Sequence, residues 1–254
     1  MVRSIAAHVI GHTIQRAEFY SSLVTRFNFG ETARALEGAV IEGIRRRGKQ
    51  IFFDLDLGIL YVHLGMTGKL LWNVATGKYA RAILELDNGT LVYEDIRQFG
   101  RVEFFESLPE AFQRAGPDAL DITFREFHSR LKNYRGQIKP LLLNQTFVSG
   151  VGNIYADELL FASRIHPLTR ASRISKRRAE LLHTKLIEVL QLAIEHRGSS
   201  ISDYVDGAGE RGSFQQMHNV YGRGGKPCPR CGALIRKIAV AQRGTHYCPR
   251  CQRA

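Results

Sequence analysis

Cys228-Pro-Arg-Cys231 and Cys248-Pro-Arg-Cys251 contain all four cysteines of this 254-residue chain. Residues 232–247 separate the two pairs, a spacing typical of a zinc ribbon held by four thiolates. Soft thiolates in a tetrahedral set suit Zn²⁺, and a closed set of four leaves no position open for catalysis. We therefore predict one structural Zn²⁺ ion. Two disulfides are the alternative, but two tight pairs in a long chain make a poor disulfide framework.

The segment around these cysteines is basic, and no Asp or Glu occurs from Arg211 to the C-terminus. Its basic residues are Arg211, Arg223, Lys226, Arg230, Arg236, Lys237, Arg243, Arg250 and Arg253. Such one-sided charge is typical of a module that contacts phosphates. Residues 234–240 and 245–247 predict two strands joined at Gln242-Arg243-Gly244, so we expect a β-hairpin with Arg243 at its tip. A solvated turn residue is the alternative role for Arg243.

Composition favours an intracellular nucleic-acid-binding protein. With 44% hydrophobic residues, the chain can form one large domain or two ordinary domains beside the zinc ribbon. The formal charge of +12 and the pI near 9.8 indicate a polyanionic partner. No apolar run approaches the length of a membrane span, and no signal peptide opens the sequence. Binding to a membrane surface is disfavoured because no expected helix carries a basic face opposite aromatic residues.

The apolar pattern of the first half predicts a short helix followed by strands. Residues 1–10 predict an amphipathic helix that stops at Gly11. Its apolar side is expected to hold Ile5, Ala6, Val9 and Ile10. Residues 51–105 alternate between apolar and polar side chains, and Asp87-Asn88-Gly89 is a strong hairpin turn. We expect a β-sandwich or barrel within residues 1–116.

The second half predicts helices, so the fold class is α+β and multidomain. Expected helices cover residues 140–144 and 154–163, with Asn153 as the N-cap of the latter. A longer helix follows Ser175 and stops at Gly198. Residues 204–214 are polar and glycine-rich, which predicts a mobile loop. We expect a helical domain at residues 117–213 and the zinc-finger hairpin at residues 214–254.

Several side chains have the chemistry to contact nucleic acid. Gly150-x-Gly152-Asn153, at an expected helix start, presents backbone N–H groups to an anion, with Arg135 and Lys139 near it in sequence. A simple turn is the alternative for this glycine-rich stretch. Arg97 and Phe99 pair a cation with a flat apolar ring, a combination suited to prising open a base step.

Two further candidates have ordinary alternatives. Met66 lies between Gly65 and Gly68, where it is either an exposed wedge or a core methionine. Lys49 follows Arg45-Arg46-Arg47-Gly48 and is either a solvated charge at a strand end or a partly desolvated, reactive amine.

These residues closely resemble bacterial formamidopyrimidine-DNA glycosylases, and the resemblance runs from about Arg3 to Arg253. Its most specific motifs are Ile138-Lys139-Pro140, Val151-Gly152-Asn153-Ile154-Tyr155-Ala156, Val220-Tyr221-Gly222-Arg223 and Gln242-Arg243-Gly244-Thr245-x-Tyr247-Cys248. The resemblance implies an N-terminal β-sandwich, a helix-two-turn-helix domain and a four-cysteine zinc finger. It also implies a monomeric, cytoplasmic bacterial enzyme that binds duplex DNA containing an oxidised purine or an abasic site. Such enzymes remove 8-oxoguanine and formamidopyrimidines and then cut the strand by β- and δ-elimination.

The resemblance also assigns roles to individual residues. Met66, Arg97 and Phe99 are expected to fill the space left by the flipped base. Phosphate contacts are expected from His63, Arg135, Lys139, Asn153, Tyr221 and Arg243, and from Tyr79, where the family often has a histidine. Lys49 resembles the proton donor for β-elimination, and Arg243 the donor for δ-elimination. The loop at residues 206–214 matches the segment that closes over flipped 8-oxoguanine, which favours the purine-specific enzyme over its endonuclease VIII-type relative.

One departure from the family pattern concerns the start of the sequence. Family members begin with a proline nucleophile followed by a glutamate acid, whereas this sequence opens Met1-Val2-Arg3-Ser4. Gln98 also replaces a second arginine. One hypothesis is a glycosylase whose given sequence is truncated at the N-terminus. The alternative is a lesion-binding protein that no longer excises bases, because nucleophile and acid act as a unit. A transcription regulator is disfavoured because no recognition helix is placed for base readout.

Overall fold

The chain folds into two compact units, which the computed structural model describes over residues 1–200 and 205–253, except for the side chains of Ala111 and Gln113. The first unit comprises Met1–Gln113 with Ser199–Gly212, and the second comprises Arg114–Gly198 with Ser213–Ala254. The zinc-finger segment therefore folds together with the helical segment.

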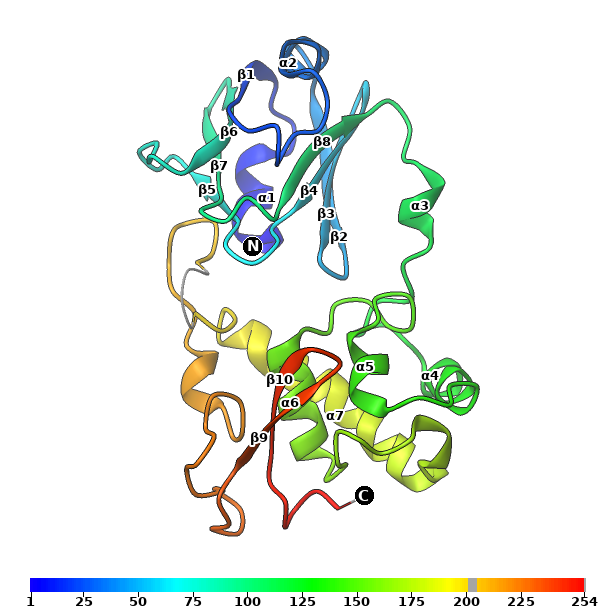
Figure 1. Ribbon diagram of the computed structural model, residues 1–254. Coiled ribbons are helices and arrows are strands. Elements are labelled where there is room, and N and C mark those ends of the chain that lie inside the picture. The colour runs from blue at the N-terminus through cyan, green and yellow to red at the C-terminus, as the bar shows by residue number, and fades with distance from the viewer. Residues whose placement is uncertain (201–204, 254) are drawn as a thin grey trace. The chain divides into compact units, whose positions relative to one another are not determined.

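The first unit contains two antiparallel four-stranded sheets (Figure 1). One sheet has the order β1 (Ile14–Phe19), β6 (Ala80–Leu86), β7 (Gly89–Glu94) and β5 (Lys69–Trp72). The other has the order β2 (Ile41–Arg47), β3 (Gln50–Leu55), β4 (Gly58–His63) and β8 (Arg101–Phe105). Side chains from both sheets, including Phe53, Leu60, Leu84 and Tyr93, share one core. The predicted β-sandwich is confirmed.

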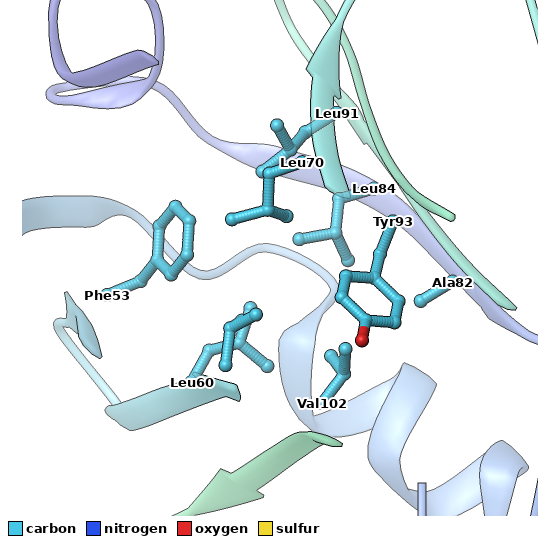
Figure 2. A pocket seen from close by; sticks show the side chains of 9 residues that line it. Phe53, Leu60, Leu70, Ala82, Leu84, Leu91, Tyr93 and Val102 are labelled. Atoms are coloured by element: carbon cyan, nitrogen blue, oxygen red, sulfur yellow. The ribbon is translucent and has the colours of Figure 1, made fainter. Parts of the chain in front are cut away.

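The interior of the sandwich is closely packed. The side chains labelled in Figure 2 come from both sheets and surround a void of about 10 Å³. An apolar void of this size has room for little more than one water molecule, so it offers no ligand site.

Among the described residues, three helices complete the first unit: α1 (Val2–Val9), α2 (Phe29–Leu36) and α3 (Glu110–Gln113). Ile5 and Val9 of α1 are fully buried in the core of the sandwich. Ile10, which the sequence pattern places on the same face, is 44% exposed. The reason is that α1 ends at Val9 and Ile10 adopts an extended conformation, so its side chain leaves the helical face.

Residues 205–212 are anchored to the first unit. The backbone N–H of Trp72 donates to the Gly207 carbonyl at 2.9 Å, and the Gly207 N–H donates to Ser4 Oγ at 2.9 Å. The Asp206 carboxylate accepts the N–H groups of Ala208 and Glu210, each at 3.0 Å. This part of the predicted mobile loop is thus held by hydrogen bonds, whereas residue 204 lies outside the described residues.

The second unit is helical, with α4 (Phe124–Lys132), α5 (Ile138–Leu143), α6 (Asn153–Ala162) and α7 (Lys176–Glu195). Short 3-10 turns cover Ala171–Arg173 (η1) and Phe214–Met217 (η2). The hydroxyls of Thr123 and Ser175 cap α4 and α7. Gly152, rather than the expected Asn153, is the N-cap of α6. No helix among the described residues is long and apolar enough to cross a membrane.

The zinc-finger hairpin packs on α6. Strands β9 (Arg236–Val240) and β10 (Arg243–Tyr247) pair antiparallel, with Arg243 opposite Val240. Ala241 and Gln242 form the turn, both with positive φ, as a two-residue hairpin turn of type I′ requires. Arg243 is therefore the first residue of β10, one position beyond the turn, and not the tip residue itself.

Candidate functional site

Met66, Arg97 and Phe99 form one exposed cluster on the first unit, called here the wedge residues. Arg97 Nη1 lies 3.3 Å from Met66 Sδ, and the guanidinium carbon of Arg97 lies 4.6 Å from the centroid of the Phe99 ring. Met66 is 61% and Phe99 55% exposed, so Met66 is a surface residue and not a core methionine. The cluster combines a cation with apolar groups in solvent, which is the chemistry of side chains that enter a base step.

Lys49 and His63 lie at one end of the sheet that contains β2, β3 and β4. Lys49 occupies the two-residue turn between β2 and β3, and its side chain is exposed. The next residue, Gln50, pairs with His63 at the end of β4. Burial lowers the pKa of His63, and the positive charges of Lys49 and Arg101 lower it further. Because the side chain of Lys49 is exposed, the protein alone does not desolvate it.

The tautomer of His63 follows from a local hydrogen bond. The backbone N–H of Gly65 donates to His63 Nδ1 at 3.1 Å, so Nδ1 acts as the acceptor. The proton of the neutral ring is then on Nε2. A neutral imidazole with Nε2–H available can donate one hydrogen bond to a phosphate oxygen.

We predict that His63 makes the first unit less stable in acid. Its folded pKa lies below the ordinary histidine value of 6.5, so the unfolded chain binds this proton more readily. The stabilisation is therefore complete above the unfolded pKa of about 6.5 and is lost as pH falls from there through the lower folded pKa. In thermal unfolding at about pH 7.5 and about pH 5.5, His63→Gln should lose less stability on acidification than the parent protein. Equal losses in the two proteins would contradict this assignment.

Tyr79 lies beside the loop that carries Arg97. Its carbonyl accepts the backbone N–H of Asp95 at 3.0 Å, and Lys78 Nζ lies 5.0 Å from the centroid of its ring. The side chain is half-buried. Tyr79 and the wedge residues thus belong to one region of the first unit.

Lys139 is buried inside the second unit. Its side chain is 0% exposed, and Nζ donates to Asp157 Oδ1 at 2.6 Å, Thr245 Oγ1 at 2.7 Å and the Gly244 carbonyl at 3.1 Å. An ammonium has three donors, so all of them are used within the protein. Lys139 thereby ties β10 to α5 and α6, and its direct contact with a phosphate stays a prediction.

Asp157 is the centre of the same network. Besides Lys139, its carboxylate accepts the backbone N–H of His246 at 2.8 Å and lies 3.3 Å from Nδ1 of that ring. Burial raises the pKa of Asp157, and Lys139 opposes the rise. Burial likewise lowers the pKa of Lys139, which Asp157 opposes. The pair is thus a buried ion pair whose partners each require the other.

Asn153 and Arg243 are brought together by Gly244. Asn153 Nδ2 donates to the Gly244 carbonyl at 3.1 Å, next to the exposed Arg243 side chain. Asn153 Oδ1 is buried and has no hydrogen-bond partner among the described residues. An unsatisfied oxygen beside an exposed arginine marks a place where a hydrogen-bonding ligand would complete the site.

The remaining predicted phosphate contacts of the second unit lie apart from each other in the fold. Arg135 is exposed in the connection between α4 and α5. Tyr221 is half-buried, its ring centroid is 5.2 Å from that of His246, and its backbone N–H donates to Glu158 Oε1 at 2.9 Å. Tyr221 therefore joins the region of β10, whereas Arg135 belongs to a different loop.

The four cysteines form a metal site. Their sulfur atoms all lie within 4.8 Å of one another, with 3.5 Å between Cys231 and Cys248 and 3.9 Å between Cys228 and Cys251. A tetrahedral zinc ion with Zn–S bonds of about 2.3 Å requires sulfur separations of about 3.8 Å. The backbone N–H groups of Arg230 and Cys251 point at two of the sulfurs, as is favourable for thiolates. The residues present therefore fit Zn²⁺.

Comparison with known families matches three segments of the chain. Residues 1–102 match the formamidopyrimidine-DNA glycosylase N-terminal domain, and residues 115–205 match the formamidopyrimidine-DNA glycosylase H2TH domain. Residues 225–254 match the zinc finger found in FPG and IleRS. The fold is thus that of a DNA glycosylase with a helix-two-turn-helix domain and a zinc finger.

Individual relatives agree along the whole chain. A formamidopyrimidine-DNA glycosylase of Solibacter usitatus is 47% identical over 100% of this chain and 96% of its own. A mutant of Lactococcus lactis FPG in complex with Fapy-dG-containing DNA superimposes with a TM-score of 0.91 at 35% identity, covering 99% of this chain and 96% of that one. MutM (FPG) of Thermus thermophilus gives 0.89 at 38% identity, covering 98% and 95%. This chain belongs to the formamidopyrimidine-DNA glycosylase family, which confirms the resemblance seen in the sequence.

Sequence reasoning missed the acidic residues that support the site. Asp157 holds Lys139 and β10, and Glu158 accepts the backbone N–H groups of Asn219, Val220 and Tyr221 at 2.9–3.1 Å. Asp95, buried beneath the wedge residues, was also missed. An Asp-Glu pair within an otherwise apolar helix was the available indication, because buried carboxylates need several donors.

Proposed function

We propose that this protein is a base-excision-repair glycosylase that removes oxidised purines, chiefly 8-oxoguanine and formamidopyrimidines, from duplex DNA. One observation carries the proposal: Arg97 contacts both Met66 and Phe99 on the solvent-exposed surface of the first unit. Family membership supplies the reaction class. The relatives solved with Fapy-dG-containing DNA and with abasic-site DNA support the choice of substrate.

The wedge residues are proposed to enter the stack of DNA bases at the position of the extruded base. Extruding a base costs a few kcal/mol, which an enzyme offsets by filling the vacated space and by binding the kinked backbone. Met66 and Phe99 supply the apolar surface for that space, and Arg97 supplies hydrogen-bond donors toward the orphaned partner base. His63 and Tyr79 donate to phosphates beside it.

The second unit is proposed to bind the sugar-phosphate backbone of the DNA. Asn153, Arg243, Tyr221 and Arg135 are the proposed phosphate contacts, because their side chains combine hydrogen-bonding groups or positive charge with at least partial exposure. Lys139 contributes indirectly by fixing the hairpin that carries Arg243. One Zn²⁺ ion, held by Cys228, Cys231, Cys248 and Cys251, keeps that hairpin folded.

The second proposed activity is strand cleavage at the abasic site by β- and δ-elimination. Lys49 is the proposed proton donor for the first elimination and Arg243 for the second, following the family resemblance. The amine of Lys49 suits this role because its side chain is exposed in the turn between β2 and β3, where a bound DNA strand could reach it. The segment at residues 206–214 would cover the flipped purine. We propose that the protein does this as a cytoplasmic monomer.

An incision assay tests the function. Duplexes containing 8-oxoguanine, a formamidopyrimidine or only normal bases are incubated with the protein, with and without borohydride. We expect cleavage of both lesion duplexes and no cleavage of the undamaged duplex; protein trapped by borohydride would show that an amine of this chain, such as that of Lys49, forms an imine with the sugar. Arg97→Ala should reduce the yield on both lesions, whereas Arg34→Ala, an exposed arginine on α2, should not.

The same assay distinguishes the two hypotheses about excision. Tight binding to abasic DNA without incision of 8-oxoguanine would identify a lesion-binding protein that does not excise. Because the opening residues Met1-Val2-Arg3 include no proline, the assay is repeated on a polypeptide extended through any in-frame codons upstream. Absence of both incision and lesion-dependent binding in both polypeptides would refute the proposed function.

A further inference from the structure

Asp95 is a fully buried carboxylate directly beneath the wedge residues. It follows β7 and is 0% exposed. Its Oδ1 accepts hydrogen bonds from the Thr67 hydroxyl and from the Arg97 backbone N–H at 3.2 Å. Its Oδ2 accepts from the Gly100 N–H at 2.9 Å and the Tyr93 hydroxyl at 3.3 Å. Each oxygen therefore satisfies two donors.

Three of these four donors come from the two loops that carry the wedge residues, and the fourth, the Tyr93 hydroxyl, comes from β7. In the sequence, Thr67 directly follows Met66, and Phe99 lies between Arg97 and Gly100. Thr67 Oγ1 also accepts the Arg97 N–H, at 3.0 Å, which makes a second link between the same loops. One buried carboxylate thus fixes the backbone at both sides of the Met66–Arg97 contact.

Glycines allow the two loops to approach this closely. Gly65 has φ +61°, and a Cβ at this position would lie 2.8 Å from backbone atoms of Phe99 and Gly100. A Cβ on Gly100 would overlap the Tyr93 hydroxyl. The loops are therefore in backbone contact, and the carboxylate is the group that determines their register.

We propose that Asp95 is a positioning residue for damage recognition, which acts by holding Met66, Arg97 and Phe99 in the arrangement that enters the base stack. This inference rests on the proposed function of the wedge residues. Only an ionised carboxylate offers acceptors to all four donors. An asparagine of equal volume turns an NH₂ group toward two of them and loosens both loops.

A double-mutant cycle tests the proposal. Affinity for a duplex containing a tetrahydrofuran abasic analogue is measured for the parent protein, Asp95→Asn, the triple variant Met66→Ala/Arg97→Ala/Phe99→Ala, and the combination of all four changes. We expect Asp95→Asn to weaken binding about tenfold in the parent and less than about twofold in the triple variant. Fluorescence of 2-aminopurine opposite the abasic analogue should be lower in the complexes of Asp95→Asn and of the triple variant than in the complex of the parent protein.

Two controls separate positioning from a general loss of stability. Leu84→Ala removes buried apolar volume in β6 of the same unit and should leave abasic-site affinity unchanged below its melting temperature. Thr67→Val removes one donor to Asp95 and the acceptor for the Arg97 N–H, so it should weaken binding to abasic DNA as well. It replaces Asp95→Asn as the test if that variant does not fold.

The outcomes are distinguishable. Equal losses from Asp95→Asn in the parent and the triple background would assign Asp95 a structural role only and overturn the inference. Unchanged affinity in both Asp95→Asn and Thr67→Val would also overturn the inference about Asp95. The proposed function would still stand in that case if the triple variant binds abasic DNA poorly. A triple variant that binds like the parent would refute both the wedge role and the inference.

Discussion

Replacing Asp157 with alanine is expected to lower the unfolding free energy of the second unit by about 3–5 kcal/mol, the cost of leaving one partner of a buried ion pair without its counter-charge. Lys139 would keep its ammonium in a fully buried position, with its hydrogen bond to Asp157 lost. The backbone N–H of His246, which donates to Asp157 at 2.8 Å, would also lose its acceptor. Urea unfolding followed by circular dichroism measures this effect.

Two further variants serve as controls for the Asp157→Ala prediction. Glu180→Ala, at an exposed position of α7, should change the unfolding free energy by less than about 0.5 kcal/mol. Lys139→Met/Asp157→Leu should recover much of the loss, because apolar side chains of similar volume remove the desolvation cost of both charges. A loss below about 1 kcal/mol in Asp157→Ala would mean that the pair does not hold the hairpin on the helices.

Removal of zinc is expected to have the second large effect. The hydrophobic cluster of the zinc-finger segment consists largely of its own cysteines together with Phe161, Val220 and Ile235. Such a small cluster does not fold without its metal, which contributes about 10–16 kcal/mol in zinc-finger peptides at pH 7. Chelation or Cys248→Ser should therefore disorder β9 and β10, and we expect affinity for abasic DNA to fall by at least about 100-fold.

Metal analysis and binding titrations check the zinc prediction. The untreated protein should contain one zinc ion per chain, and restoring Zn²⁺ after chelation should restore binding. Cys248→Ser should not respond to added Zn²⁺, which separates loss of the metal from damage caused by the chelator. Unchanged binding and unchanged thermal unfolding after complete removal of the metal would refute a structural role.

The parts of the site that could be recognised from the sequence are those whose residues lie close together along the chain. The cysteine pairs could be recognised because zinc ligands of a knuckle are neighbours in sequence. Arg97 and Phe99 were found for the same reason, and the structure places Met66 against them. Strands of the sandwich were evident from alternation where every second residue is buried, as in β6.

The parts that could not be predicted depend on contacts distant in sequence. Lys139 was expected to contact a phosphate, and its burial follows from contacts with Asp157 and with Thr245, which is 106 residues away. Nothing near Asp95 in the sequence indicates that Thr67 donates to it. The position of Arg243 beyond the hairpin turn was also missed, because Ala241 and Gln242 adopt positive φ without the usual glycine or asparagine.

The central claim is that this protein recognises damage by placing Met66, Arg97 and Phe99 in the space of an extruded nucleotide. The most direct measurement compares affinity for a tetrahydrofuran-containing duplex with affinity for the same duplex without the lesion, at one salt concentration. We predict at least about tenfold tighter binding to the lesion, and a similar affinity for both duplexes in Arg97→Ala/Phe99→Ala. Equal affinity of the parent protein for the two duplexes, or full discrimination by the double variant, would contradict the claim.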